Sequence, residues 1–223
     1  MNDRRLATAL SLLLTAIIVA GCNIAGPVAY FIEGPPSVNA QYTLPDRPTV
    51  VFVDDRANAI GTSAPTIRRA IAEKVSEDLM VKKLVTTTIS PRDAMGVVAT
   101  SDRHGELMPI DAIGRAVGAE QIIYVQMLSF SGTSDGATPR PTAVCRVRVI
   151  DVVERKRLFP APDSEDASRL MEVQTREIDP AMLRSAASRL KVYQALADET
   201  GEQIAKLFYK HEVKELGGSL EPR

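Results

Sequence analysis

Tryptophan is absent from this sequence, and aromatic residues make up only 4% of its 223 residues. Proteins that bind single-stranded nucleic acid or quaternary ammonium groups depend on aromatic platforms and cages. Basic residues are not in excess either, because 27 lysines and arginines are balanced by 28 aspartates and glutamates, which gives a formal charge of −1. The composition therefore predicts a protein that has no nucleic acid among its partners.

Histidine and cysteine are also scarce, with two of each. His104 lies in a polar stretch and His211 near the C-terminus, and neither has a cysteine or histidine at metal-ligand spacing. The sequence contains no G-x-S-x-G, phosphate-loop or H-E-x-x-H motif. We therefore predict no metal, no cofactor and no catalytic residue, and we expect a protein that is not an enzyme.

The N-terminus has the pattern of a secretory signal. A short basic segment precedes Leu6–Ala20, which is uncharged and shorter than the roughly 20 residues that a spanning helix needs. The following sequence VAGC (residues 19–22) resembles the lipobox of bacterial lipoproteins. That resemblance implies cleavage between Gly21 and Cys22, leaving Cys22 as an acylated first residue. Acyl chains would anchor the protein in a membrane.

Asn23 follows the cysteine, where lipoproteins retained in the inner membrane typically carry aspartate. The resemblance therefore implies an outer-membrane protein that faces the periplasm. With Cys22 acylated, the remaining Cys145 has no partner for an intramolecular disulfide. Because Cys145 lies in a β-rich run, we predict a small buried side chain.

The segment after the cysteine is predicted to be an extended tether over residues 22–47. Five prolines, at positions 27, 35, 36, 45 and 48, favour extended backbone over helix. Val28–Ile32 is too apolar for a simple spacer. Two interpretations stay open: this cluster packs on its own domain, or it contacts a partner or a membrane.

Residues 48–210 are predicted to form one α/β (α+β) domain, followed by a disordered tail over 211–223. The apolar run at 49–53 indicates a buried strand, and Ile67, Ile71, Val75 and Leu79 give the four-residue repeat of an amphipathic helix. Further strands are expected at 83–90, 121–130, 143–153, 157–159 and 170–178, with helices at 109–118 and 181–211. This order predicts a mixed sheet of about five strands with helices packed on it.

Three sequence segments resemble those of a family of envelope lipoproteins. They are AIGRAVGAEQIIYVQM (112–127), VRVIDVVERKRLF (147–159) and EQIAKLFYKH (202–211). The family includes the curli-secretion lipoprotein, the penicillin-binding-protein activator lipoproteins and the amino-terminal domain of the Tol translocation protein. The family's turn usually carries a glycine, which Glu154–Lys156 lacks. The resemblance implies scaffolding work: contacting a partner, activating a synthase or forming a ring, so a homo-oligomer is possible.

Asp54 and Asp55 are the candidate ligand-binding residues. They follow the first strand, and ligands of open α/β sheets bind at the carboxyl ends of strands, where two carboxylates could hold a hard cation. The alternative is a loop or capping role, because neighbouring strand residues point to opposite faces and Arg56 is adjacent. Asp151, inside an apolar strand, is predicted to make a structural hydrogen bond.

These observations favour a non-catalytic envelope lipoprotein that acts through protein–protein contacts in cell-envelope assembly or peptidoglycan-synthesis control. Its partners would be outer-membrane lipid, through Cys22, and an envelope protein that the sequence does not identify. The alternatives are a periplasmic lipoprotein that binds a small ligand or cation and, third, an enzyme.

Overall fold

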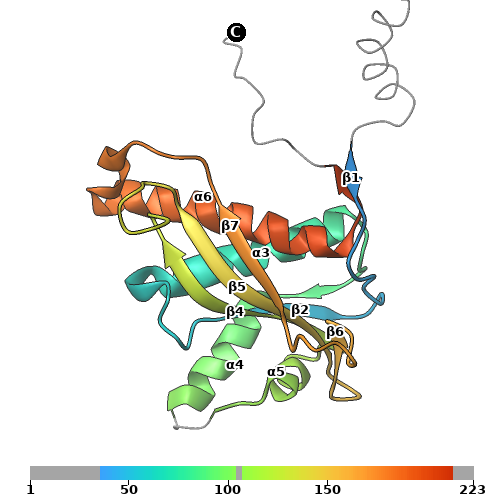
Figure 1. The fold of residues 1–223 in the computed structure, drawn as a ribbon. Coiled ribbons are helices and arrows are strands. Elements are labelled where there is room, and N and C mark those ends of the chain that lie inside the picture. The colour runs from blue at the N-terminus through green and yellow to red at the C-terminus, as the bar shows by residue number, and fades with distance from the viewer. Residues whose placement is uncertain (1–35, 104–106, 213–223) are drawn as a thin grey trace, which may run out of the picture. The chain divides into compact units, whose positions relative to one another are not determined.

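The computed structural model describes residues 36–103 and 107–212 (Figure 1). Contacts divide the chain into two units. One unit combines residues 1–39 and 210–223, and its described part is a two-stranded antiparallel pair of β1 (Ser37–Val38) and β8 (His211–Glu212). The other unit, Ala40–Tyr209, holds the sheet and the helices. Gly21, Cys22 and the apolar cluster at 28–32 lie outside the described residues.

The larger unit contains a six-stranded mixed sheet in the order β3-β2-β4-β5-β6, with β7 also paired to β5. Its strands are β2 (Thr49–Asp54), β3 (Thr88–Ile89), β4 (Gln121–Ser131), β5 (Thr142–Asp151), β6 (Lys156–Phe159) and β7 (Arg169–Gln174). β2 is parallel to β3 and β4, whereas the pairs that β5 makes with β4, β6 and β7 are antiparallel. The predicted α/β fold with a mixed sheet is confirmed.

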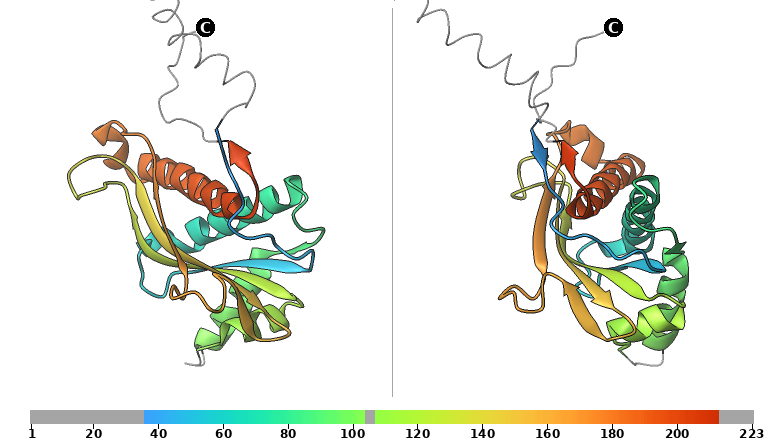
Figure 2. Two further views of the ribbon diagram at one scale, coloured as in Figure 1. Left: turned by 45° about the vertical axis from the view of Figure 1, so that its right-hand side comes forward. Right: turned by 90° about the vertical axis from the view of Figure 1, so that its right-hand side faces the viewer.

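Helices cover both faces of β2 (Figures 1 and 2). The helices are α3 (Ala64–Val81), α4 (Pro91–Arg103), α5 (Ile110–Ala116) and α6 (Ala186–Ala205), with short 3-10 turns at Gly61–Ser63, Pro180–Leu183 and Lys206–Phe208. Val51 and Val53 pack with α3 and α6, and the alternate residues Val50 and Phe52 pack with α4 and α5. This arrangement explains why all six residues of β2 are buried.

The predicted amphipathic helix is confirmed in α3, where Ile67, Ile71, Val75 and Leu79 are all buried. Pro65 stands in its first turn, a position that proline favours. None of the described helices is both long and apolar enough to span a bilayer. Cys145 is fully buried, as predicted, and burial raises the pKa of its thiol to about 12.

Two predicted elements differ from the structure. The strand expected over 83–90 is wrong except at Thr88–Ile89, because Lys83 adopts φ 56° and the amide of Leu84 donates to the carbonyl of Leu79, which closes the end of α3. The single final helix expected over 181–211 is wrong in extent, because Pro180–Leu183 is a 3-10 turn, α6 ends at Ala205, and His211–Glu212 form β8. Ser185 precedes α6 and caps it, since its side chain accepts a hydrogen bond from the amide of Ser188 at 3.1 Å.

Residues 40–48, which we call the strap, lead to β2 without helix or strand and bend at Gln41 and at residues 46–47. Leu44 is buried in the core that α3 and α6 share with the sheet. The amides of Gln41 and Tyr42 donate to the carbonyl of Leu207 at 2.8 and 3.2 Å. Further along, the carbonyl of Pro45 accepts a hydrogen bond from Gln121 at 2.8 Å. The C-terminal part of the proline-rich segment is therefore fastened to the folded unit.

Candidate functional site

The two predicted ligand residues have different surroundings. Asp54 is 4% exposed, and its carboxylate accepts hydrogen bonds from the hydroxyl of Tyr124 and from the amide of Arg56 at 3.1 Å. Asp55 closes the next loop by accepting the amides of Ala59 and Ile60 at 2.7 and 3.2 Å. The structure thus shows a loop-closing contact for each carboxylate, and the ligand role stays a prediction.

On the face of the sheet that α4 and α5 cover, Asp54 is the first of a row of polar side chains in contact with one another. Tyr124 lies on β4, and burial together with its hydrogen bond to Asp54 raises the pKa of its phenol. Arg148 is the cross-strand neighbour of Tyr124 on β5, and its guanidinium carbon lies 4.9 Å from the centre of the Tyr124 ring. This cation–π contact holds the guanidinium group of Arg148 over the aromatic ring.

A cavity of about 450 Å³ opens beside Arg148. It lies between the start of α5, the β5–β6 hairpin and the loop that follows β6. The residues that line it are Ile110, Asp111, Arg148, Ile150, Arg155, Lys156, Arg157, Pro162 and Ala167. We refer to this cavity as the hairpin pocket. Its lining contains four cationic side chains and one carboxylate.

The hairpin turn that carries two of these cations is held by Asp151. Its carboxylate accepts the amides of Val153 and Glu154 at 2.9 and 2.8 Å and forms an ion pair with Arg47 of the strap at 2.7 Å. Burial alone would raise the pKa of Asp151, but these hydrogen bonds outweigh it and hold the pKa below its ordinary value. The structural role predicted for Asp151 is confirmed.

Arg155 stands at the tip of the same turn with φ 55°. This left-handed conformation favours glycine, since a side chain at Cβ crowds the backbone there. The absence of glycine from residues 154–156 was visible in the sequence, and the structure shows that the turn still takes the backbone form that glycine suits. An arginine is therefore placed over the pocket against the local backbone preference.

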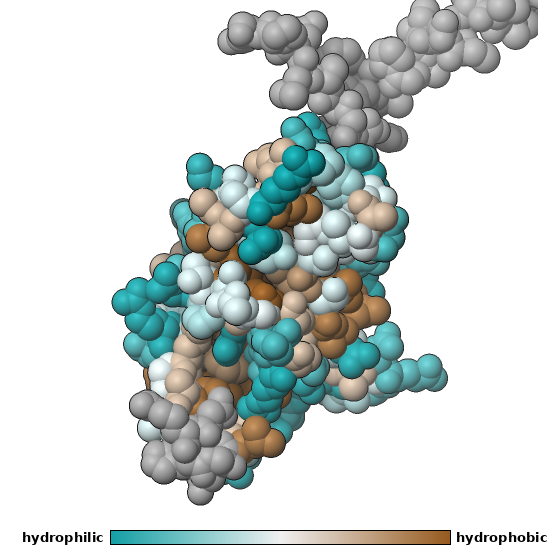
Figure 3. Space-filling view, turned by 90° about the vertical axis from the view of Figure 1, so that its left-hand side faces the viewer, coloured by the Kyte–Doolittle hydropathy of each residue, from teal (hydrophilic) through white to brown (hydrophobic). Residues whose placement is uncertain are grey.

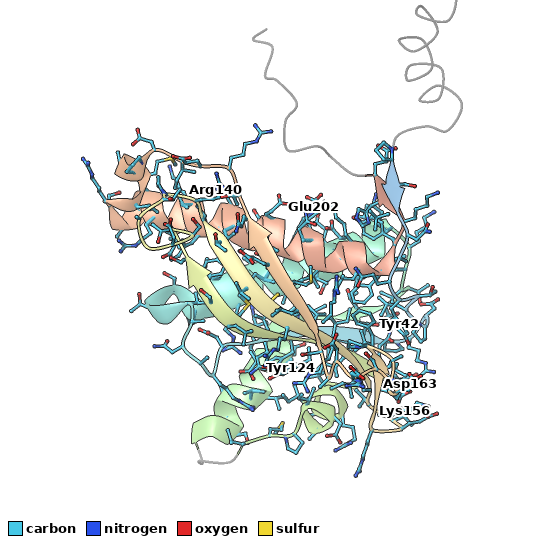
Figure 4. The ribbon with its side chains drawn as sticks, in the orientation of Figure 1. Tyr42, Tyr124, Arg140, Lys156, Asp163 and Glu202 are labelled. Carbon is cyan, nitrogen blue, oxygen red and sulfur yellow. The ribbon has the colours of Figure 1, made fainter. Side chains whose placement is uncertain are left out.

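Arg157 and the loop after β6 form the remaining wall. One terminal nitrogen of Arg157 donates to the carbonyls of Ala161, Pro162 and Ser164 at 2.9, 3.0 and 3.3 Å. These bonds fold residues 161–164 back over the hairpin. Lys156 lies at the hairpin, as Figure 4 shows, and its ammonium is paired with Glu154. The hydrogen bond to Glu154 raises the pKa of Lys156, so the ammonium group stays protonated at neutral pH.

The one carboxylate in the lining is already paired. Asp111 accepts a hydrogen bond from Arg115 at 2.6 Å and lies 3.6 Å from the Nε of Arg155. The bond to Arg115 lowers the pKa of Asp111, which keeps it ionised. By contrast, Arg148 and Arg157 have no carboxylate within ion-pair distance among the side chains described, those of residues 36–101 and 107–212, and the Nε atom of each is buried without a hydrogen-bond partner there.

The sequence did not indicate the hairpin pocket, because its residues come from segments far apart in the chain. Asp54 belongs to the same row of polar side chains but not to the pocket lining. No group of three or more histidine, cysteine, aspartate or glutamate side chains suited to a metal ion occurs in the part of the chain that the structure describes.

No protein-family model matches the chain, and no curated protein matches it. Among solved structures it is similar to the hypothetical protein CT253 from Chlamydia trachomatis, with 17% identity over 71% of this chain and 96% of that one and a TM-score of 0.42. It is also similar to the LpoB C-terminal domain from Escherichia coli (15% identity, 67% and 94% covered, TM-score 0.34). A third is lipoprotein GNA1162 from Neisseria meningitidis (13%, 66% and 94%, TM-score 0.31).

These identities and TM-scores are low, so the function of the chain is inferred from its own residues. They assign no family to the chain. The finer assignment to one group of envelope lipoproteins stays a prediction.

Proposed function

We propose that the protein is a bacterial envelope lipoprotein, anchored in the outer membrane through Cys22, that acts by contacting another envelope protein. The contact would serve cell-envelope assembly or the control of peptidoglycan synthesis. The observation that carries the anchoring is the VAGC sequence at the end of an uncharged leader. The proline-rich segment after Cys22, which the sequence predicts to be extended, would let the domain reach a partner in the periplasm.

A surface of the folded unit supports the role in protein contact. On β5 and β7, alternate residues point away from the core that α3 and α6 cover. Near the hairpin this second face of β5 borders α5, because Ile150 packs against the cluster that contains Ile113. The exposed residues on this face include Arg146, Leu170 and Glu172, and Leu170 is 57% exposed.

Large exposed hydrophobic side chains are also present elsewhere in the described part, namely Val38, Met80, Val81, Leu107, Val153, Met182 and Leu190. Figure 3 shows one face of the molecule on which hydrophobic residues gather between hydrophilic ones. Mixed surfaces of this kind, with apolar groups rimmed by charge, are typical of protein interfaces.

Metabolic labelling with an alkyne fatty acid tests the anchor. The wild-type chain should incorporate the label and partition into the outer-membrane fraction, and Cys22→Ala should do neither. Cys145→Ala is the matched control, because it removes the only other thiol of the chain and should leave labelling unchanged. Labelling that survives in Cys22→Ala would refute the proposed site.

Site-specific photocrosslinking in living cells tests the contact. A photoreactive residue at Leu170 should give a discrete adduct with one envelope protein, identified by mass spectrometry. The control position is Val81, which is 66% exposed but lies at the end of α3. If neither position gives an adduct, or both give the same ladder, the exposed face of β5 and β7 is not the contact surface.

The hairpin pocket favours the alternative function, a lipoprotein that binds a small ligand. A volume of about 450 Å³ lies within the usual range for small-molecule sites, roughly 300–1,000 Å³. The same pocket could serve the first function if the ligand is a chemical group on the partner. The excess of positive charge in its lining favours an anionic ligand.

A further inference from the structure

We infer that the hairpin pocket binds a multiply charged oxyanion of the phosphate class, with Arg148 as its principal contact. The inference is independent of the proposed anchoring, because every residue that lines the pocket belongs to the folded unit Ala40–Tyr209. It goes beyond the contact function by naming the chemistry that the molecule recognises.

Charge is the first observation. Four cationic side chains line the pocket, and the single carboxylate there, Asp111, is already paired with Arg115. Lys156 is balanced by Glu154. Arg148 and Arg157 therefore contribute positive charge that no carboxylate of the described residues neutralises. Two uncompensated guanidinium groups suit a ligand with two or more negative charges better than a single carboxylate.

The state of Arg148 is the second observation. Its side chain is partly buried and stacked on Tyr124, and its Nε has no hydrogen-bond partner among the described residues. Burying a polar donor such as this Nε without a hydrogen-bond partner is costly. Stacking on a buried ring also orients the guanidinium fork in advance, which reduces the entropy lost when the fork binds an oxyanion.

The tip of the hairpin is the third observation. Arg155 occupies a left-handed backbone position that glycine would take without strain, and its side chain lines the pocket. Strained backbone conformations of non-glycine residues concentrate at binding and active sites. The side chain of Arg155 is 69% exposed, so it can close over a ligand that Arg148 holds.

Binding of inorganic pyrophosphate to the full chain in non-ionic detergent tests the inference by isothermal titration calorimetry. The wild-type chain should bind one pyrophosphate per chain, and acetate at the same concentration should not compete. Arg148→Met keeps an unbranched apolar side chain beside Tyr124 but removes the guanidinium group and its charge. It should weaken binding about tenfold or more, which corresponds to about 1.4 kcal/mol.

Arg155→Gly is the second variant, and it leaves the contact between Arg148 and Tyr124 in place. Glycine suits φ 55°, so the hairpin should keep its conformation while the pocket loses one charge. Binding should weaken several-fold. Arg140→Met is the charge-matched control, since Arg140 is exposed and Figure 4 shows it at the end of the sheet remote from Lys156.

The outcomes separate the inference from a general effect of charge. Pyrophosphate binding that is weakened in Arg148→Met and Arg155→Gly but unchanged in Arg140→Met supports it. Equal weakening in all three variants, or no saturable binding of pyrophosphate to the wild-type chain, overturns it. Competition by phosphatidic acid vesicles, with phosphatidylcholine vesicles as the blank, would point to a lipid headgroup as the source of the phosphate. If pyrophosphate binds and phosphatidic acid vesicles do not compete, the source is a soluble phosphate compound.

Discussion

Replacement of Asp151 tests how the β5–β6 hairpin is held. Its carboxylate is 1% exposed and accepts three hydrogen bonds, two from turn amides and one from Arg47. A hydrogen bond to a charged group contributes roughly 1.5–3 kcal/mol to stability when water cannot take the place of the lost partner. The Arg47 side chain is 36% exposed and regains water, and the turn amides lie near the surface. Asp151→Ala should therefore lower the free energy of unfolding by about 3 kcal/mol.

Asp151→Asn separates the two kinds of contact. Its amide oxygen can still accept the amides of Val153 and Glu154, whereas the charge that pairs with Arg47 is gone. We expect a loss of about 1 kcal/mol. Urea unfolding followed by circular dichroism measures both variants. If Asp151→Asn is as unstable as Asp151→Ala, the ion pair and not the turn holds the hairpin.

The same variants predict a pH dependence. The pKa of Asp151 is lower in the folded chain than the unfolded value of about 3.9. Its contribution is thus fully present above that unfolded value and is lost as pH falls through the folded pKa. The difference in stability between wild type and Asp151→Asn should shrink on acidification from pH 7. A difference that stays constant down to pH 2 would refute the assignment.

Three further predictions follow from close contacts and burial. Gly201→Ala should lower the free energy of unfolding by about 1–3 kcal/mol, because the added Cβ would lie 2.7 Å from Cβ of Lys74 and 3.0 Å from the carbonyl oxygen of Ile71. Thermal melting measures this change. An unchanged melting temperature would show that α3 and α6 move apart to accept the methyl group. Arg155→Gly should stabilise the chain by about 0.5–1 kcal/mol in urea unfolding, since relief of the left-handed strain exceeds the added flexibility of the unfolded chain. Cys145 should resist a thiol reagent in the native chain at pH 8 and react only in denaturant, because burial raises the pKa of its thiol to about 12. Fast labelling of the native chain would contradict the buried position of Cys145.

The sequence predicted the elements whose pattern is set by burial. The run at 49–53 was recognised as a strand buried on both faces because nearly all its residues are apolar, and α3 because its apolar residues recur every four positions. The strand expected over 83–90 failed because its β-branched threonines suggested a strand where the chain leaves α3 through a turn at Lys83. There, hydrogen bonds to Asp46 of the strap hold Thr86. Strand propensity did not reveal these contacts.

The hairpin pocket could not be predicted in the same way. Arginines that alternate with valines along β5 have the pattern of an ordinary solvent-exposed face, and only the three-dimensional fold places Arg148 on Tyr124. Asp54 was singled out because it ends a strand, which is correct, but its partner Tyr124 lies 70 residues further along the chain. The missing glycine at 154–156 was the one local signal, and its meaning depends on the backbone angle of Arg155.

The strap has a mechanical consequence for a protein held by lipid at Cys22, as proposed. A pull on the membrane anchor would reach Ala40 and load the strap's hydrogen bonds in chain order, from the amides of Gln41 and Tyr42 to the carbonyl of Pro48, which accepts the amides of Glu120 and Gln121. The following strand β2 is clamped between two parallel neighbours and would resist as a block. Tension would therefore detach the strap, about nine residues that span at most roughly 30 Å when fully extended, before the sheet yields. The bond between Arg47 and Asp151 would break in this process, and Asp151 holds the hairpin turn, so load on the anchor and the shape of the pocket would be coupled.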